Sequence, residues 1–203
     1  MVAAGVVVLG LVNHVSSGSS ATASSAQWGL FSAFSLPATG SMDDYVRAIA
    51  DDLGADEQDR ASFRTLLSGV GRFDSRLVAF RSFHGRNVCY SFLAAERTDP
   101  GMSYCYRPYA DNAPAGLAGE HFSVVAPESH TGPNLDVGTQ VFGVAEDDVV
   151  SVRVLVAGSW QKIPIAHNAL YLDLPGIPQS DVGTVEVTLS DGSTQWHDLR
   201  TGI

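Results

Sequence analysis

Two cysteines, Cys89 and Cys105, are the residues of this 203-residue chain whose chemistry is easiest to frame. They do not form a C-x-x-C motif, so the redox and zinc motifs with that spacing are excluded. Three alternatives remain. The cysteines form a disulfide, or they are two reduced and partly buried thiols, or Cys89 is a free thiol acting as a nucleophile with His84 or His121 as its base. We favour the disulfide, because the strand register described next makes the other cysteine the neighbour of Cys89 and because the N-terminus indicates export.

The segments around the cysteines read as a three-stranded meander over Leu77–Phe83, Asn87–Leu93 and Met102–Tyr106. Gly85-Arg86 is expected as a two-residue turn, which sets Ser82 opposite Cys89, and Asp99-Pro100-Gly101 is a second turn signal. The register that pairs Cys89 with Cys105 gathers Val88 and the aromatic residues on one face, namely Phe83, Tyr90, Phe92, Tyr104 and Tyr106. Such a stripe is either a ligand platform or core, and we favour core covered by two helices.

The histidines and acids do not form a local site. No two of the six histidines lie three or four residues apart, so no pair forms a local metal site. A site assembled from histidines distant in the sequence stays open. The histidines are His14, His84, His121, His130, His167 and His197. Glu146-Asp147-Asp148 is either a weak calcium site or a solvated turn, and we favour the turn. The motifs G-x-S-x-G and H-E-x-x-H are absent. The sequence therefore assigns no catalytic, metal-binding or cofactor-binding residue and predicts no cofactor.

The N-terminus indicates the compartment. Val2–Val12 is an uncharged apolar run, shorter than the roughly 20 residues that span a bilayer, and the first basic residue of the chain is Arg47. Ser16–Ala26 reads as a flexible tether. The run is either the distal half of a transmembrane helix that begins before Met1, a signal segment cleaved near Ala23 or Ala26, or a buried element. We expect a body outside the cytoplasm, anchored in the cell membrane or secreted after cleavage.

The overall charge of the chain limits which classes of partner it is expected to bind. The net charge is −10, from 22 acidic and 12 basic residues, and no Lys/Arg run occurs. Such a field repels phosphate backbones, so nucleic acid is not an expected partner. The length suits one domain or two small ones.

The remaining pattern predicts a mainly β, α+β chain with the following organisation. Helices are expected from Ser41 to Leu53 and from Asp56 to Leu67. The Trp28–Pro37 segment packs on the body or lines the membrane. A Pro/Ala/Gly-rich stretch over Tyr106–Gly119 marks a boundary. The expected parts are residues 1–27 as anchor or signal plus tether, 28–108 as an α+β region with the meander, and 120–203 as an immunoglobulin-like β-sandwich or small barrel.

Two hairpins are expected in the last part. A turn at Ala157-Gly158 sets Val152 opposite Ile163 and places Arg153 opposite Lys162, a mild repulsion. Pro164 indicates that this partner strand is an edge strand. A turn centred on Asp191-Gly192 pairs Val187 with Trp196, Glu186 with His197 and Val185 with Asp198. This register puts Trp196 on the inner face.

The stretches VFGVAEDDVVSVRVLV, IPIAHNALYLDLP and VGTVEVTLSDGS carry a resemblance. Over Thr139–Leu199 the chain resembles the C-terminal β module of uncharacterised, membrane-anchored exported proteins of high-GC Gram-positive bacteria. The resemblance implies a cell-envelope location and no known activity. A binding or interaction module with a protein or glycan partner at the envelope is favoured, because β-sandwich modules commonly bind through loops and no nucleophile–base pair is evident. The alternatives are a cell-surface hydrolase with a non-local site and the outer sensor domain of a larger membrane regulator.

Overall fold

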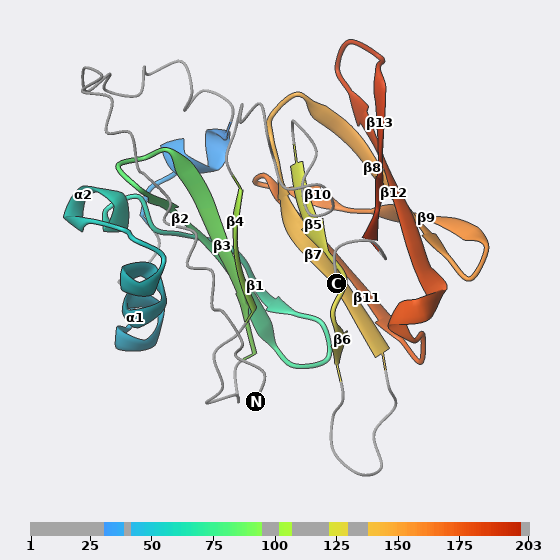
Figure 1. The fold of residues 1–203 in the computed structure, drawn as a ribbon, viewed down its shortest axis with the longest axis horizontal. Helices are drawn as coiled ribbons and strands as arrows, with labels where there is room; N and C mark the ends of the chain where they lie inside the picture. Colours follow the sequence, from blue (N-terminus) through green and yellow to red (C-terminus); the bar gives the residue numbers. More distant parts are fainter. Residues whose placement is uncertain (1–30, 39–41, 95–101, 107–121, 130–137, 200–203) are drawn as a thin grey trace, which may run out of the picture.

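The protein is mainly β, with three antiparallel sheets and two short helices. The helices lie at one end of the long axis, and the three sheets follow one after another along it (Figure 1). The computed structural model describes residues 31–38, 42–94, 102–106, 122–129 and 138–199. The helices are α1 (Asp44–Asp52) and α2 (Glu57–Arg60), and two 3-10 turns are η2 (Ser32–Ser35) and η3 (Gln179–Asp181). Among these residues, no helix has the length and apolar character that crossing a membrane requires.

The strands form sheets that we name A, B and C. Sheet A has the order β1 (Arg64–Val70), β2 (Ser75–Ser82), β3 (Asn87–Leu93) and β4 (Met102–Tyr106). Sheet B has the order β10 (Ile165–Ala166), β11 (Ala169–Pro175), β7 (Gly138–Ala145) and β5 (Phe122–Val125), with β6 (Glu128–Ser129) also paired to β7. Sheet C has the order β13 (Thr194–Asp198), β12 (Val182–Leu189), β8 (Val149–Val156) and β9 (Ser159–Ile163).

The meander has the expected strands, and its second register is confirmed. Cys89 lies opposite Cys105, and Tyr90 lies opposite Tyr104. The first turn is wrong by two residues, because Phe80 rather than Ser82 faces Cys89. The loop is longer because Phe83 and His84 both take left-handed backbone conformations, and the His84 amide donates a hydrogen bond to Asp59. A shift of two keeps every strand residue on its expected face, and only the turn residue Phe83 leaves the stripe.

The second expected helix is wrong for most of its length. Only α2 is helical, and residues from Arg64 onward form strand β1. The side chains explain this difference. Phe63 packs with the helices, whereas Leu66 packs on the other side of sheet A, and this alternation belongs to a strand rather than to one stripe of a helix. The Ser62 hydroxyl accepts the Arg81 amide at 2.7 Å and so ties the start of β1 to β2.

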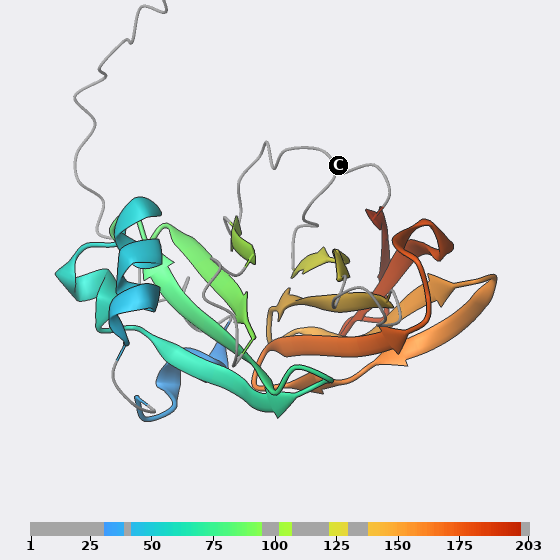
Figure 2. The same ribbon diagram turned by 90° about the horizontal axis from the view of Figure 1, so that it is seen from below.

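The aromatic stripe is core, but the helices do not cover it. Residues of α1 pack on the opposite face of sheet A, against Val78, Phe80 and Cys89. The aromatic face packs on sheet B instead, where Phe92 stacks on Phe142 at 4.6 Å and on Tyr171 at 5.3 Å. The described part of the Trp28–Pro37 segment joins this seam, because Phe31, Ala33 and Phe34 are buried in the same cluster. Figure 2 shows sheet A between the helices and sheet B.

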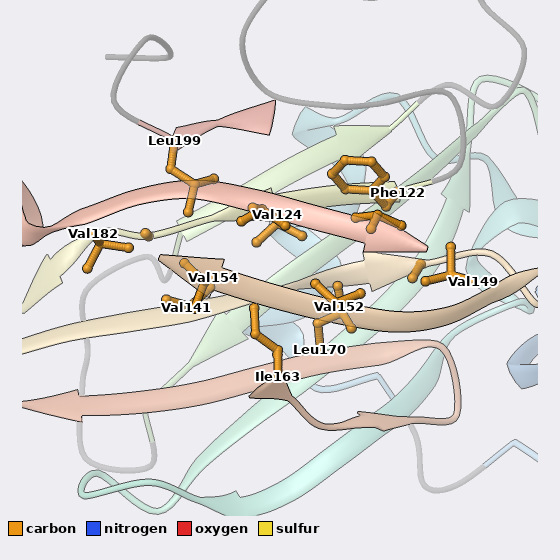
Figure 3. Close-up of a cluster of buried hydrophobic side chains, with 14 of the residues drawn as sticks. Phe122, Val124, Val141, Val149, Val152, Val154, Ile163, Leu170, Val182 and Leu199 are labelled. Carbon is orange, nitrogen blue, oxygen red and sulfur yellow. The ribbon is translucent and has the colours of Figure 1, made fainter. Parts of the chain in front are cut away.

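Sheet B is therefore buried on both faces. Every residue of β7 is buried, and its continuous apolar reading reflects this position between two layers. Gly143 allows the close approach of β5, since a Cβ there would lie 2.0 Å from the Ser123 carbonyl oxygen. The other face of sheet B packs on the valines of sheet C, and Figure 3 shows this core, with Phe122, Val141, Val152, Val154, Ile163 and Leu170 among its members.

The first hairpin of sheet C is confirmed, and the second is shifted. Val152 faces Ile163, and β9 is an edge strand that ends before Pro164. At the last turn, the Leu189 amide bonds to the Ser193 carbonyl, and Gly192 has a φ of +86°. The loop therefore has three residues rather than two, with the glycine in the left-handed position that closes such a turn.

This one-residue shift turns the last strand over. Trp196 lies opposite Glu186 on the outer face, and His197 lies opposite Val185 on the inner face. The expected positions of Trp196 in the core and of His197 beside Glu186 are both wrong.

Candidate functional site

The outer face of sheet C is a candidate binding surface, because it holds large aromatic side chains that remain open to solvent. Trp160 on β9 is 39% exposed and Trp196 on β13 is 60% exposed. The two strands are the opposite edges of the sheet. The indole rings meet across it, with centroids 5.7 Å apart and planes at 63°. Exposed tryptophan is uncommon on a surface that binds nothing, since its area is mostly apolar.

The Trp160 ring is held in place from beneath by the neighbouring strands. The Arg153 guanidinium lies 5.3 Å from the Trp160 ring centroid, a cation–π distance. Arg153 also donates hydrogen bonds to the Glu186 carboxylate, one of them from Nε at 2.8 Å. Glu186 is only 8% exposed. The arginine is therefore fixed by a carboxylate and in turn orients one ring, which leaves Trp196 as the more accessible platform.

The charges on this face are unevenly balanced. Arg153 lies directly opposite Lys162, as the Ala157-Gly158 turn predicted. Lys162 is exposed and, within the described residues, makes no ion pair. Two cations and one engaged carboxylate thus surround the tryptophan pair. Directly opposed like charges destabilise a sheet, so the pair Arg153 and Lys162 slightly lowers the stability of sheet C.

Hydroxyl groups complete the surface. The outward positions of β8 and β12 include Ser151 opposite Thr188, and Thr194 on β13 faces the same threonine. Hydroxyls both donate and accept hydrogen bonds, so this row offers polar contacts to a ligand that stacks on the rings. We name the set the tryptophan face, and its members are Ser151, Arg153, Trp160, Lys162, Glu186, Thr188, Thr194 and Trp196.

Sequence reasoning missed this site for one physical reason. The two-residue reading of the last turn assigned Trp196 to the core, and Trp160 received no role. The available signal was the alternation of β12, in which Val185 and Val187 face inward and Glu186 faces outward. A partner of Glu186 must share its outward face, and a three-residue turn makes that partner Trp196.

The histidines do not come together in the described part of the chain. His84 lies in its turn and contacts the Asp56 carboxylate through Nδ1 at 2.7 Å. His197 packs edge-on against Phe122 at 6.0 Å, and His167 lies in the turn between β10 and β11. His14, His121 and His130 lie outside the described residues. Within those residues, no group of three metal-ligating side chains occurs.

The acidic turn holds the N-terminal segment rather than standing free in solvent. Asp147 accepts hydrogen bonds from the Ser32 amide and from the Asn168 side chain at 2.7 Å. Asn168 also accepts the Ala33 amide at 2.8 Å. These bonds cap η2 from a distant part of the chain. Glu146 is buried and Asp148 is half-buried, so the expectation of a solvated turn holds only for Asp147.

The two cysteines are joined as a disulfide, with sulfur atoms 2.01 Å apart. Cys89 is buried, while Cys105 on the edge strand β4 is exposed. The Cys89 sulfur lies 3.0 Å from the Ser82 hydroxyl, which donates to it. The disulfide leaves no free thiol at Cys89, which a nucleophile would need, so the structure contradicts that alternative.

Comparison with known proteins adds no assignment, because no family model, curated protein or solved structure matches the chain.

Proposed function

We propose that this chain is an extracytoplasmic binding module, held at the cell membrane by its N-terminal segment, that binds a partner of the cell envelope through the tryptophan face. The observation that carries the proposal is the exposed pair Trp160 and Trp196 on an open sheet. Tryptophan and arginine are the residues that most often dominate binding energy when a partner covers them. The sandwich of sheets B and C supplies a rigid base, and its immunoglobulin-like relationship is part of this proposal.

The location rests on the sequence. The apolar run Val2–Val12 and the tether Ser16–Ala26 precede Phe31, the first described residue, which is buried in the body. An exported body also agrees with the joined cysteines, since disulfides persist in oxidising compartments. Either membrane anchoring or cleavage near Ala26 delivers the tryptophan face to the outside.

The location is tested with a reporter enzyme that folds only after export. The reporter is fused after Ala26 and, as a matched control, directly after Met1. We expect activity only in the first fusion, and we expect the native protein in the membrane fraction or the medium. Recovery of the folded native protein from the cytosol contradicts the proposed location.

The binding role is tested by sedimenting the full chain with isolated cell-envelope fragments. Trp196→Ala should lower the bound fraction at least tenfold, because it removes the most accessible ring. Phe83→Ala is the matched control, since Phe83 is an aromatic residue of similar exposure in the turn between β2 and β3. Equal loss in both variants, or in neither, contradicts binding through the tryptophan face.

A further inference from the structure

The tryptophan face collects most of the positive charge of an otherwise acidic half of the chain. Between residues 108 and 203 the sequence has twelve carboxylate side chains and three Lys/Arg residues, and two of these, Arg153 and Lys162, lie in sheet C. Those two residues face each other on adjacent strands. Lys162 is also the only lysine of the whole chain. A scattered distribution would have separated two such cations, so their joint position beside the aromatic pair points to a negatively charged ligand.

The charge balance on the face leaves one cation for that ligand. Glu186 is engaged by Arg153, and within the described residues Lys162 makes no ion pair. A bound carboxylate next to Lys162 converts an unfavourable pair of like charges into a favourable group of two cations and two anions. The ligand therefore supplies the counter-charge that the described part of the chain does not provide here.

The surroundings of the cations indicate the rest of the ligand's chemistry. Trp196 is an open ring, and the row of Ser151, Thr188 and Thr194 offers hydroxyl groups on the same face. A sugar ring has an apolar C–H side that stacks on an aromatic ring and hydroxyl groups that pair with such a row. A protein partner would instead be expected to meet a broader apolar centre.

The opposite end of the molecule repels the same ligand. Residues 43–60, which include α1 and α2, carry seven acidic side chains and two arginines. Figure 1 places these helices at one end of the long axis and sheet C at the other. An anionic polymer is therefore directed away from the helices and toward the tryptophan face.

We propose that the tryptophan face binds a carboxylated polysaccharide, with a sugar ring stacked on Trp196 and its carboxylate beside Lys162 and Arg153. This assignment rests on the proposed function and names its ligand class.

The experiment measures binding of the full chain, kept in solution with a polyoxyethylene detergent, by calorimetry at low salt. The probe is polygalacturonate, and the matched neutral probe is the same polymer with its carboxylates methyl-esterified. We expect polygalacturonate to bind at least fivefold more tightly and to lose this advantage when the salt is raised to about 0.5 M, where charges are screened within a few ångströms. Trp196→Ala should weaken both probes about tenfold.

Two charge variants give the sharpest test. Lys162→Gln should remove most of the preference for polygalacturonate and leave the ester unchanged, whereas Arg47→Gln on α1 should change neither probe. Equal binding of both polymers with dependence on Trp196 overturns the acidic specificity and leaves the binding function standing. Equal binding of poly-glutamate and polygalacturonate overturns the sugar assignment. Self-association of Lys162→Gln with unaltered polymer binding shows that the lysine only protects the edge of β9, and this overturns the proposal.

Discussion

Sheets A and C are the two outer sheets of the molecule, with sheet B between them, and their outward faces differ in a way that separates stability from function. The outward face of sheet A is apolar, with Val78 and Phe80 fully buried beneath α1. The outward face of sheet C instead carries Arg153, Trp160 and Trp196 in contact with solvent. An apolar outward face requires a cover from the same chain. A mixed face of rings, charges and hydroxyls is stable without one, and it remains available for a partner.

The largest expected difference between the two faces appears when an aromatic residue is truncated on each. Phe80→Ala should lower the free energy of unfolding by about 3–5 kcal/mol, because it leaves a cavity between sheet A and the helices. Trp196→Ala should lower it by about 1 kcal/mol or less, since the ring is mostly exposed. Chemical unfolding of both variants measures this difference. Comparable losses would mean that the tryptophan face is part of the folded core.

The disulfide gives the second largest effect, and it concerns only sheet A. The cysteines are 16 residues apart in sequence, and their bond fixes the edge strand β4 to β3. Replacing both Cys89 and Cys105 with serine should cost about 2–4 kcal/mol. Polygalacturonate binding at sheet C should stay unchanged, because β4 belongs to sheet A, on the other side of sheet B.

Mass spectrometry provides the direct measurement of the bond. The native protein should show no free thiol before reduction and two after it. Two free thiols in protein recovered from the cell envelope would contradict the disulfide and the oxidising location together.

These two regions also show which features the sequence determines on its own. The meander register was predictable because Cys89, Tyr90 and Val88 all find matching partners in one alignment. The Ala157-Gly158 hairpin was predictable for a similar reason, since Val152 and Ile163 must face inward together. In both cases the side-chain pattern of the two strands is satisfied by a single register.

The misses share a physical origin as well. Asp191-Gly192 fits either a two-residue or a three-residue turn, because the glycine takes a left-handed conformation in both. The choice reverses the face of Trp196, so a one-residue ambiguity concealed the candidate site. The face of sheet A on which the helices pack could also not be predicted from neighbouring residues in the sequence. It depends on sheet B, whose Phe142 and Tyr171 cover the aromatic stripe from a distant part of the sequence.

A smaller effect concerns acid and the helical cover of sheet A. Burial raises the pKa of Asp43, but hydrogen bonds from Arg76 and from the Val46 amide outweigh this and bring its pKa below the usual 3.8. A lowered pKa in the folded state means that the stabilisation is complete above the unfolded pKa and is lost as the pH falls through the folded value. The contribution is below about 1 kcal/mol, because exposed ion pairs are screened by water.

We therefore expect the amide protons of α1 to lose protection from exchange below about pH 4, before those of β8, whose inward side chains are valines. Hydrogen exchange followed by NMR between pH 6 and pH 2.5 measures the order. Asp43→Asn keeps a cap acceptor and removes the titration, so its α1 should show no such step. Loss of protection in β8 at a higher pH than in α1 would contradict the assignment of the acid-sensitive end.

The smallest expected effect tests whether the tryptophan face is maintained at a cost to stability. Arg153 and Lys162 are directly opposed, so Lys162→Gln should raise the free energy of unfolding of the ligand-free protein by about 0.2–0.5 kcal/mol. Lys162→Glu should raise it slightly more, because it places a carboxylate opposite Arg153. Arg47→Gln, which removes an exposed contact to Asp44, should change stability by a similar amount in the opposite direction.

The sign of the Lys162 effect is what matters in this comparison. A lysine whose removal stabilises the free protein but weakens polygalacturonate binding is retained for the ligand rather than for the fold. Thermal unfolding with and without polygalacturonate measures both quantities in the same samples, since a ligand that binds only the folded state raises the unfolding temperature. If Lys162→Gln destabilises the free protein, then the two cations are not in conflict, and the charge argument for an acidic ligand loses its energetic basis.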